Sequence, residues 1–264
     1  MSFTNKNRPS VKLAAPQGVS LLGVVLIIAV WKIGAVFAGT EVILPGPLTV
    51  AGSLLDVVRS PGFISALGAT ALRGLAAFFL AALLGLFCGV AAGLSTVFRN
   101  LIQPLVIIIK STPVMSFILL ALIWFPSGIV PVFVSVLMAF PIIYENTVAG
   151  IRNADTRLIE MARVYRVPRS RILRTILLPG LYTFFMAGAR TGLGIIWKAV
   201  IAAEILSRPV AAVGSAMYEA KIYIETAEVI AWTVIAVLLS GLSEFLLGRS
   251  TLLFTGIRRG GAVL

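Results

Sequence analysis

Residues 146–206 read NTVAGIRNADTRLIEMARVYRVPRSRILRTILLPGLYTFFMAGARTGLGIIWKAVIAAEIL. Between Arg152 and Arg174 this stretch holds seven arginines and two acids, whereas the runs on both sides are apolar enough to lie in hydrocarbon. A single arginine near the centre of a bilayer costs about 3 kcal/mol or more. The charged part is therefore predicted to lie in water beside a membrane, between two membrane spans.

The charged part has the pattern of two short helices. Asp155 or Thr156 can cap the first helix, and Pro168 marks its boundary, because the residue before a proline disfavours helical angles. A second helix is expected over about 169–177. Their apolar stripe needs a cover, either the neighbouring spans and the lipid surface or a docked cytoplasmic protein. The residues of this stripe recur at helical spacing: Leu158, Ile159, Ala162 and either Val164 or Tyr165.

The composition excludes several function classes. Of 264 residues, 59% are hydrophobic and 12% are charged, which is too apolar for a soluble domain. There is no histidine, and Cys88 is the only cysteine, so neither a disulfide framework nor a metal site is expected. The groups that acid–base and nucleophilic enzymes use are also missing, so we expect no catalytic residue. The net charge of +12 is assigned to contact with lipid headgroups and not with nucleic acid.

The apolar runs predict an all-α integral membrane protein with about six spans. A basic cytoplasmic segment, 1–18, precedes a transmembrane domain, 19–250, whose charged loop covers about 150–180; a cytoplasmic tail, 251–264, follows. The first span is taken as retained and not as a cleaved signal peptide. Pro104, Pro113 and Pro141 are expected to kink the spans that contain them. The spans are expected at about 19–37, 69–94, 103–125, 132–148, 181–206 and 229–247.

The basic residues set the orientation of these spans. With both termini inside, the inner segments hold 14 lysines and arginines, the outer segments hold 3, and 5 fall within spans. Inner loops are the ones enriched in basic residues. We therefore expect a multi-pass protein of the bacterial cytoplasmic (inner) membrane, with both termini and the charged loop in the cytoplasm.

The charged loop carries a known motif with two departures. It resembles the cytoplasmic loop of permease subunits of binding-protein-dependent ABC importers, which reads Glu-Ala-Ala, three residues, Gly, nine residues, Ile, one residue, Leu-Pro. Met161 stands for an alanine, and Arg166 stands for the glycine that lets the family's loop turn, so Pro168 is expected to set the turn. The residues at motif spacing are Glu160, Met161, Ala162, Arg166, Ile176, Leu178 and Pro179.

A second set of matches points to one group within that family. The chain is similar to permeases of the nitrate, sulfonate, taurine and bicarbonate group, and the likeness covers roughly 40–250. This implies a small anion as cargo, with a thiamine-precursor pyrimidine or another small heterocycle as the alternative. The matching segments are Leu44-Pro45-Gly46-Pro47, Arg73, Lys110 with Pro113, Trp124-Phe125, Ala189 to Gly194, and Ala203-Glu204.

The resemblance implies a type I importer permease fold, in which the charged loop forms coupling helices that dock on an ATPase. The chain has no G-x-x-x-x-G-K-[ST] phosphate loop, so it binds no cofactor itself, and ATP with Mg²⁺ would sit on the partner. Further expected partners are a second permease copy, as a homodimer, an extracytoplasmic substrate-binding protein and the lipid bilayer. A channel or scaffold without ATP coupling is the alternative of another class. The expected coupling residues are Arg157, Leu158, Glu160, Met161, Ala162, Tyr165, Arg166, Ile176, Leu178 and Pro179.

Charged and small residues within the spans are the remaining candidates. Lys110, Arg190, Lys198 and Glu204 must face protein or water, since charge in lipid is costly. They either line a translocation path that favours anions or brace helices, with Glu145 as a partner for a base such as Arg190. Glycines at four-residue spacing predict close helix packing. These glycines are Gly85, Gly89 and Gly93 in the second span, and Gly188 and Gly192 in the fifth.

Overall fold

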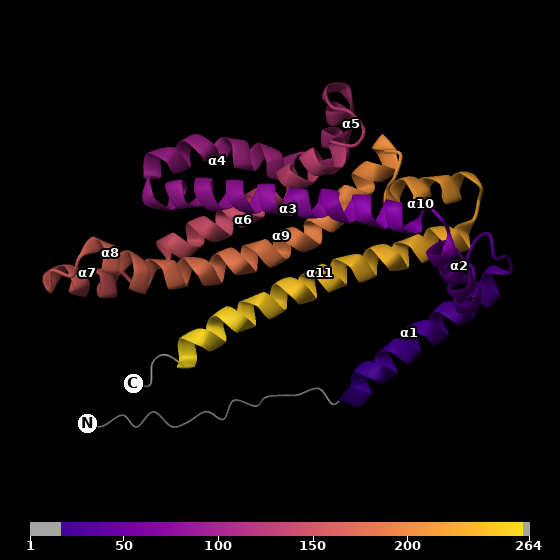
Figure 1. The fold of residues 1–264 in the computed structure, drawn as a ribbon, viewed down its shortest axis with the longest axis horizontal. Coiled ribbons are helices and arrows are strands. Elements are labelled where there is room, and N and C mark those ends of the chain that lie inside the picture. The colour runs from indigo at the N-terminus through magenta and orange to yellow at the C-terminus, as the bar shows by residue number, and fades with distance from the viewer. Residues whose placement is uncertain (1–16, 261–264) are drawn as a thin grey trace.

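The computed structural model describes residues 17–260, and every regular element in that range is helical (Figure 1). Residues 1–16 of the predicted basic segment and 261–264 of the predicted tail lie outside the described residues. The elements are α1 (Gln17–Ala38), α2 (Pro47–Arg59), α3 (Phe63–Leu94), α4 (Thr96–Ser111), α5 (Val114–Trp124), α6 (Val130–Arg152), α7 (Thr156–Val164), α8 (Arg169–Ile172), the π-helical turn η1 (Leu173–Leu177), α9 (Leu178–Ser207), α10 (Val213–Ile222) and α11 (Thr226–Gly260).

The predicted spans fall on these helices, which confirms the all-α membrane class. Within residues 17–260, four stretches are long and apolar enough to cross a membrane: Phe63–Leu94, Val130–Arg152, Ser170–Ser207 and Thr226–Arg249. The pair α4 and α5 passes the same test as one bent unit, and the described part of α1, Leu22–Ala38, is a shorter apolar helix. The six predicted spans therefore correspond to four long helices, one bent pair and one shorter helix.

The third predicted span differs most from expectation. It was expected as one kinked helix over 103–125, but α4 and α5 meet at 102° across a break at Thr112 and Pro113. Pro104 lies inside α4 without ending it, so only the second proline interrupts the helix. α4 also begins early, because the hydroxyl of Ser95 accepts a hydrogen bond from the N–H of Phe98 at 3.3 Å.

The core is built around α6, which packs against α3 on one side and α9 on the other. Glycines allow the close approach of α3. A Cβ added at Gly89 would lie 2.5 Å from the Cβ of Thr147, a distance that no real side chain tolerates. Three predicted packing glycines of α3, Gly85, Gly89 and Gly93, face Ile143, Thr147 and Ile151 of α6, in that order.

The opposite side of α6 meets α9 in a similar way. A Cβ added at Gly188 would lie 2.7 Å from the Cβ of Asn146, and one at Gly192 would lie 3.2 Å from Ile143. Small residues thus let α3 and α9 approach α6 until their backbones almost touch it, as in other membrane bundles. α3, α6 and α9 form one tightly packed unit.

Figure 1 shows how the ends of this unit differ. The short helices α7 and α8 lie at one end of the long helices, and α2 and α10 lie at the other end. α9 runs between the two ends, and its 30 residues extend about 45 Å. Any movement imposed at the α7 end therefore has a continuous helix along which it can reach the α10 end.

Candidate functional site

The charged loop begins with a capped helix. The backbone N–H of Arg157 donates to Oδ1 of Asp155 at 2.9 Å, so Asp155 serves as the predicted cap of α7. α7 then extends for nine residues to Val164. The cap fixes where the helix starts and therefore which side chains its outer face presents.

α7 ends at the position where the family motif has glycine. Arg166 adopts a left-handed backbone with φ of 54°, and the N–H of Val167 donates to the carbonyl of Ala162 at 2.8 Å. This is the bonding pattern of a helix that closes on a left-handed residue, a position glycine usually fills. The expectation that Pro168 replaces the glycine was therefore wrong, because Arg166 itself makes the turn.

The outer face of α7 exposes apolar side chains. Met161 is 53% exposed and Tyr165 is 77% exposed, and Leu158 is exposed beside them. Ala162 differs, because it is only 7% exposed and so is covered by the chain itself. Leu158, Met161, Ala162 and Tyr165 are all among the expected coupling residues, and of these four, three lie open and one packs inward.

The second short helix is continuous with a membrane span. α8 passes into η1, and η1 passes directly into α9 at Leu178. Pro179 occupies the first turn of α9, where a missing N–H costs no helical hydrogen bond. Ile176 is half-buried on η1, and Leu178 is exposed. The second short helix, expected over about 169–177, therefore continues into α9 without a break.

The two predicted basic residues of α9 lie exposed along that helix. Arg190 and Lys198 are eight residues apart, which is about 12 Å along the axis. Arg190 borders a cavity of about 770 Å³ between α9 and α11, which Glu244 and Arg249 also line. A Cβ added at Gly194 would lie 2.8 Å from Oε1 of Glu244, so that carboxylate reaches across to α9.

Neither the acidic Glu244 nor the basic Arg249 was predicted as a site residue. Both follow an apolar run within α11, and the sequence alone does not place that run beside α9. The cavity between the two helices therefore carries charged groups of both signs, with two arginines and one glutamate. Such a lining suits a hydrated path for a small polar solute better than contact with lipid.

Lys110 and Glu145 form an ion pair between α4 and α6. The Nζ of Lys110 donates to both carboxylate oxygens of Glu145 at 2.9 Å, and the two side chains are 51% and 42% exposed. We expected Glu145 to pair with a base such as Arg190, and the structure gives it Lys110 instead. Such an exposed pair contributes little to stability, so its position matters more than its energy.

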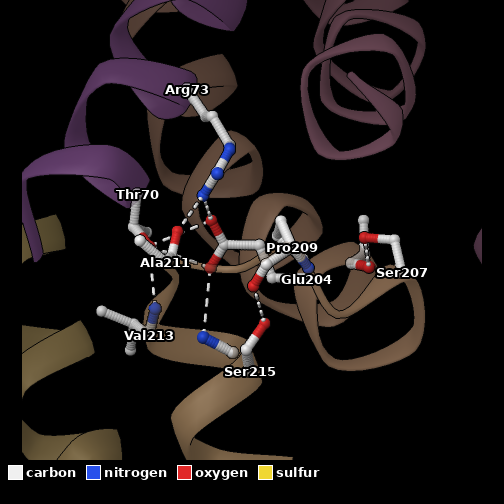
Figure 2. A network of polar contacts seen from close by, with 10 residues as sticks. Thr70, Arg73, Glu204, Ser207, Pro209, Ala211, Val213 and Ser215 are labelled. Atoms are coloured by element: carbon white, nitrogen blue, oxygen red, sulfur yellow. Dashed lines mark hydrogen bonds and ion pairs between the residues drawn. The ribbon is translucent and has the colours of Figure 1, made fainter. Parts of the chain in front are cut away.

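Glu204 lies in a closed polar network and not in the cavity. Its carboxylate is fully buried, and Figure 2 shows how side chains of α3 and backbone groups at the start of α10 converge on it. Nη1 of Arg73 donates to Oε1 of Glu204 at 2.9 Å and to the carbonyl of Ala211 at 2.8 Å. The hydroxyl of Thr70 donates to the same carboxylate.

The N-terminal turn of α10 completes this network. The N–H of Gly214 donates to Oε2 of Glu204 at 3.1 Å, and the N–H of Val213 donates to the hydroxyl of Thr70 at 2.9 Å. A carboxylate at a helix N-terminus is stabilised by the free amide groups there. Glu204 therefore ties α3, α9 and α10 together, which matches a bracing role better than a place on the translocation path.

A signal for this pairing was present in the sequence. Arg73 and Glu204 are opposite charges in two apolar runs, and an unpaired charge in hydrocarbon is costly enough that such residues seek each other. Thr70 lies three residues before Arg73 and so on the same face of α3. No comparable signal identifies the backbone donors of α10.

The model of the family described as "Binding-protein-dependent transport system inner membrane component" matches residues 81–251. The taurine transport system permease protein TauC of Escherichia coli is 28% identical over 189 residues, which is 69% of each chain. The putative aliphatic sulfonates transport permease protein SsuC of Bacillus subtilis is 28% identical, covering 83% of this chain and 80% of that protein.

Two further similarities extend these matches. The bicarbonate transport system permease protein CmpB of Synechococcus elongatus is 28% identical over 147 residues, 54% of this chain and 52% of that protein. Among solved structures, a crystal structure of an amino acid ABC transporter with histidines superposes with a TM-score of 0.59 at 19% identity. The match covers 76% of this chain and 96% of that one, and it concerns the fold.

Proposed function

The chain belongs to the family of binding-protein-dependent transport system inner membrane components and is a permease subunit of an ABC importer with the type I fold. From this membership we propose that it forms the translocation path for a small anion, such as a sulfonate, nitrate or bicarbonate. Relatives named for taurine, aliphatic sulfonates and bicarbonate favour an anion over a neutral heterocycle.

The exposed apolar face of α7 is the observation that carries the proposed mechanism. Leu158, Met161 and Tyr165 project from a loop that is otherwise rich in arginine. Apolar side chains surrounded by charge are typical of a surface that another protein covers. The proposed partner is a cytoplasmic ATPase subunit, which would receive this face in a groove and bind the surrounding arginines through its acids.

The junction of the loop with α9 supports force transmission from that partner. α8, η1 and α9 follow one another without a break, and α9 packs on α6 through glycines. ATP binding would close two ATPase subunits, move the two loops of a permease homodimer, and open a path toward the outside. A binding protein would deliver the anion there, and hydrolysis would restore the inward-open state.

The charges near the α9–α11 cavity support the choice of an anion. Arg190 and Arg249 line that cavity with one acid, Glu244, so basic groups are in excess there, and Lys198 is exposed farther along α9. Cationic groups in a cavity with low-dielectric walls raise the local concentration of anions. ATP and Mg²⁺ would bind to the partner, and the chain itself would supply only the path, with both of its termini in the cytoplasm.

Met161→Asp and Tyr165→Asp test the docking proposal. Each places a charge on the face that the partner would cover, and we expect the ATPase to be lost from the purified complex. Val210→Asp is the matched control, because Val210 is equally apolar and fully exposed at the opposite end of α9. It should leave the ATPase bound.

Membrane insertion of all three variants is measured alongside, so that loss of the partner is separated from loss of the permease. If the Met161→Asp and Tyr165→Asp variants still purified with a stoichiometric amount of ATPase, the docking proposal would be contradicted. Loss of ATPase on Val210→Asp as well would show that the effect is not specific to α7.

A further inference from the structure

An apolar groove lies beside the charged loop, outside the α9–α11 cavity. It has a volume of about 640 Å³ and lies between the second half of α3, the end of α6, η1 and the start of α9. All its lining side chains are apolar apart from the phenol of Tyr182. Phe87, Leu94 and Leu173 are exposed toward it. The groove is therefore open, and its lining offers water little beyond the phenol of Tyr182.

The length of the groove matches one leaflet of a bilayer. Its lining on η1 and α9 extends from Leu173 to Phe185, which is about 18 Å along a helix. The hydrocarbon of one leaflet is about 15 Å thick. The groove thus has the length that an extended acyl chain needs to lie against the protein.

The volume of the groove is small compared with that of a second helix. A helix about 10 Å in diameter and 15 Å long fills roughly 1,200 Å³, about twice the volume of the groove. An acyl chain is far thinner and is available everywhere in the membrane. An acyl chain can therefore lie within the groove along its whole length, whereas a helix would lie only partly in it.

Arginines lie where the groove meets the charged loop. Arg152 directly follows the lining residue Ile151, and Arg174 directly follows Leu173, while Arg171 precedes it by two residues. All three side chains are exposed, and in the described part of the chain none of them forms an ion pair. Basic pockets between membrane helices at the cytoplasmic side are typical binding sites for anionic headgroups.

We propose that this groove binds an anionic phospholipid, with one acyl chain along Leu94, Leu177 and Phe185 and the phosphate at Arg171 and Arg174. The inference rests on the proposed function only in placing the loop at the cytoplasmic leaflet. Because Leu173 and Leu177 belong to η1, the lipid contacts the turn that joins the loop to α9. π-Helical turns of this kind occur often at functional sites.

The test uses the full chain in vesicles that contain phosphatidylglycerol with a photoactivatable group on the acyl chain. Labelled peptides are mapped by mass spectrometry, and the same probe on phosphatidylcholine is the comparison. We expect residues 86–94 and 173–185 to be labelled more by phosphatidylglycerol. Arg171→Gln and Arg174→Gln should each reduce that labelling about fivefold, the effect of one basic residue beside an anionic headgroup.

Two controls separate this site from general lipid contact. Arg59→Gln removes an equal charge from α2, at the other end of the molecule, and should leave groove labelling unchanged. Ala91→Phe fills the groove with an apolar side chain and should abolish groove labelling. It should leave labelling of the exposed Leu101 and Leu105 on α4 as it was.

Equal labelling by the two lipids would overturn the proposal, as would unchanged labelling in Ala91→Phe. A Phe87→Cys variant that forms a disulfide with a second copy and excludes the lipid probe would also overturn it. None of these readouts uses an ATPase or transport. A failure of the docking proposal therefore leaves the lipid result standing, and a failure of the lipid result leaves docking untouched.

Discussion

The guanidinium of Arg73 contacts the carboxylate of Glu204 at 2.9 Å, although 131 residues separate them in the chain. Glu204 is fully buried and Arg73 is nearly so. The pair also holds the carbonyl of Ala211 and the N–H of Gly214. One ion pair therefore fixes α3, α9 and the start of α10 relative to one another.

Removing either member of this pair should destabilise the protein strongly. Glu204→Gln leaves the charge of Arg73 uncompensated, and Arg73→Met does the same for Glu204. Breaking a buried pair in this way typically costs about 3 kcal/mol or more. We expect a clear fall in the thermal midpoint of the detergent-solubilised protein for each single variant.

The double variant Arg73→Met/Glu204→Gln should be less destabilised than the sum of the two singles. Neither side chain then carries a charge, and the amide of glutamine can still accept from Gly214. Additive losses in this cycle would show that the two charges do not act as a pair.

Arg166→Gly should stabilise the end of α7. A residue with a side chain in the left-handed region is strained by roughly 1 kcal/mol, and glycine is not. The N–H of Val167, bonded to Ala162, should therefore exchange with deuterium about fivefold more slowly. Glu160→Gly is the control, because glycine inside α7 should lower protection instead. Faster exchange in Arg166→Gly would contradict the assigned turn.

Gly89→Ala should disrupt the contact between α3 and α6. The added Cβ would lie 2.5 Å from Thr147 and 3.0 Å from the carbonyl of Tyr144, and the backbone cannot move away freely. Overpacking of this kind costs about 1–3 kcal/mol. Gly68→Ala is the matched control on the same helix, because nothing lies within 4 Å of its added Cβ. It should be neutral or slightly stabilising in the same thermal assay.

Lys198→Ala should reduce uptake of an anionic cargo. A unit charge about 10 Å from an anion contributes roughly 1.7 kcal/mol at an effective dielectric constant near 20, or roughly fifteenfold. Lys198→Arg should retain most of the uptake, since it keeps the charge. Lys110→Ala should have a smaller effect, because Glu145 already compensates Lys110. Unchanged uptake in Lys198→Ala, with normal amounts of protein, would argue against a path tuned to anions.

The sequence predicted the parts of the fold that depend on local pattern. The apolar runs located the spans, and Asp155 was a predictable cap because its carboxylate can reach the free amides of the next turn. The break at Pro113 was predictable as a kink, since proline blocks a helical hydrogen bond. The angle of 102° was not, because it depends on how α4 and α5 pack on α6 and α9.

Long-range pairing explains most of the differences at the site. Glu145 has several bases within its sequence neighbourhood, and only the packing of α4 on α6 selects Lys110. Glu204 and the apolar coupling residues Leu158, Met161, Ala162 and Tyr165 were singled out from the sequence, and their roles stay predictions. Which of them are buried depends on contacts that no local pattern encodes. The turn at Arg166 was missed for a different reason. A residue with a side chain can hold a strained left-handed backbone when the surrounding hydrogen bonds fix it there, so its identity did not reveal the turn.

The separation of Arg73 from Glu204 also bears on how the protein is made. A ribosome adds about 5–20 residues per second, so Glu204 emerges roughly 7–26 s after Arg73. During that interval α3 carries an arginine without its counter-ion. The nascent chain must therefore shelter Arg73 at the headgroups or inside the insertion machinery until α9 arrives. Final assembly of the bundle therefore cannot finish until almost four fifths of these 264 residues have been translated.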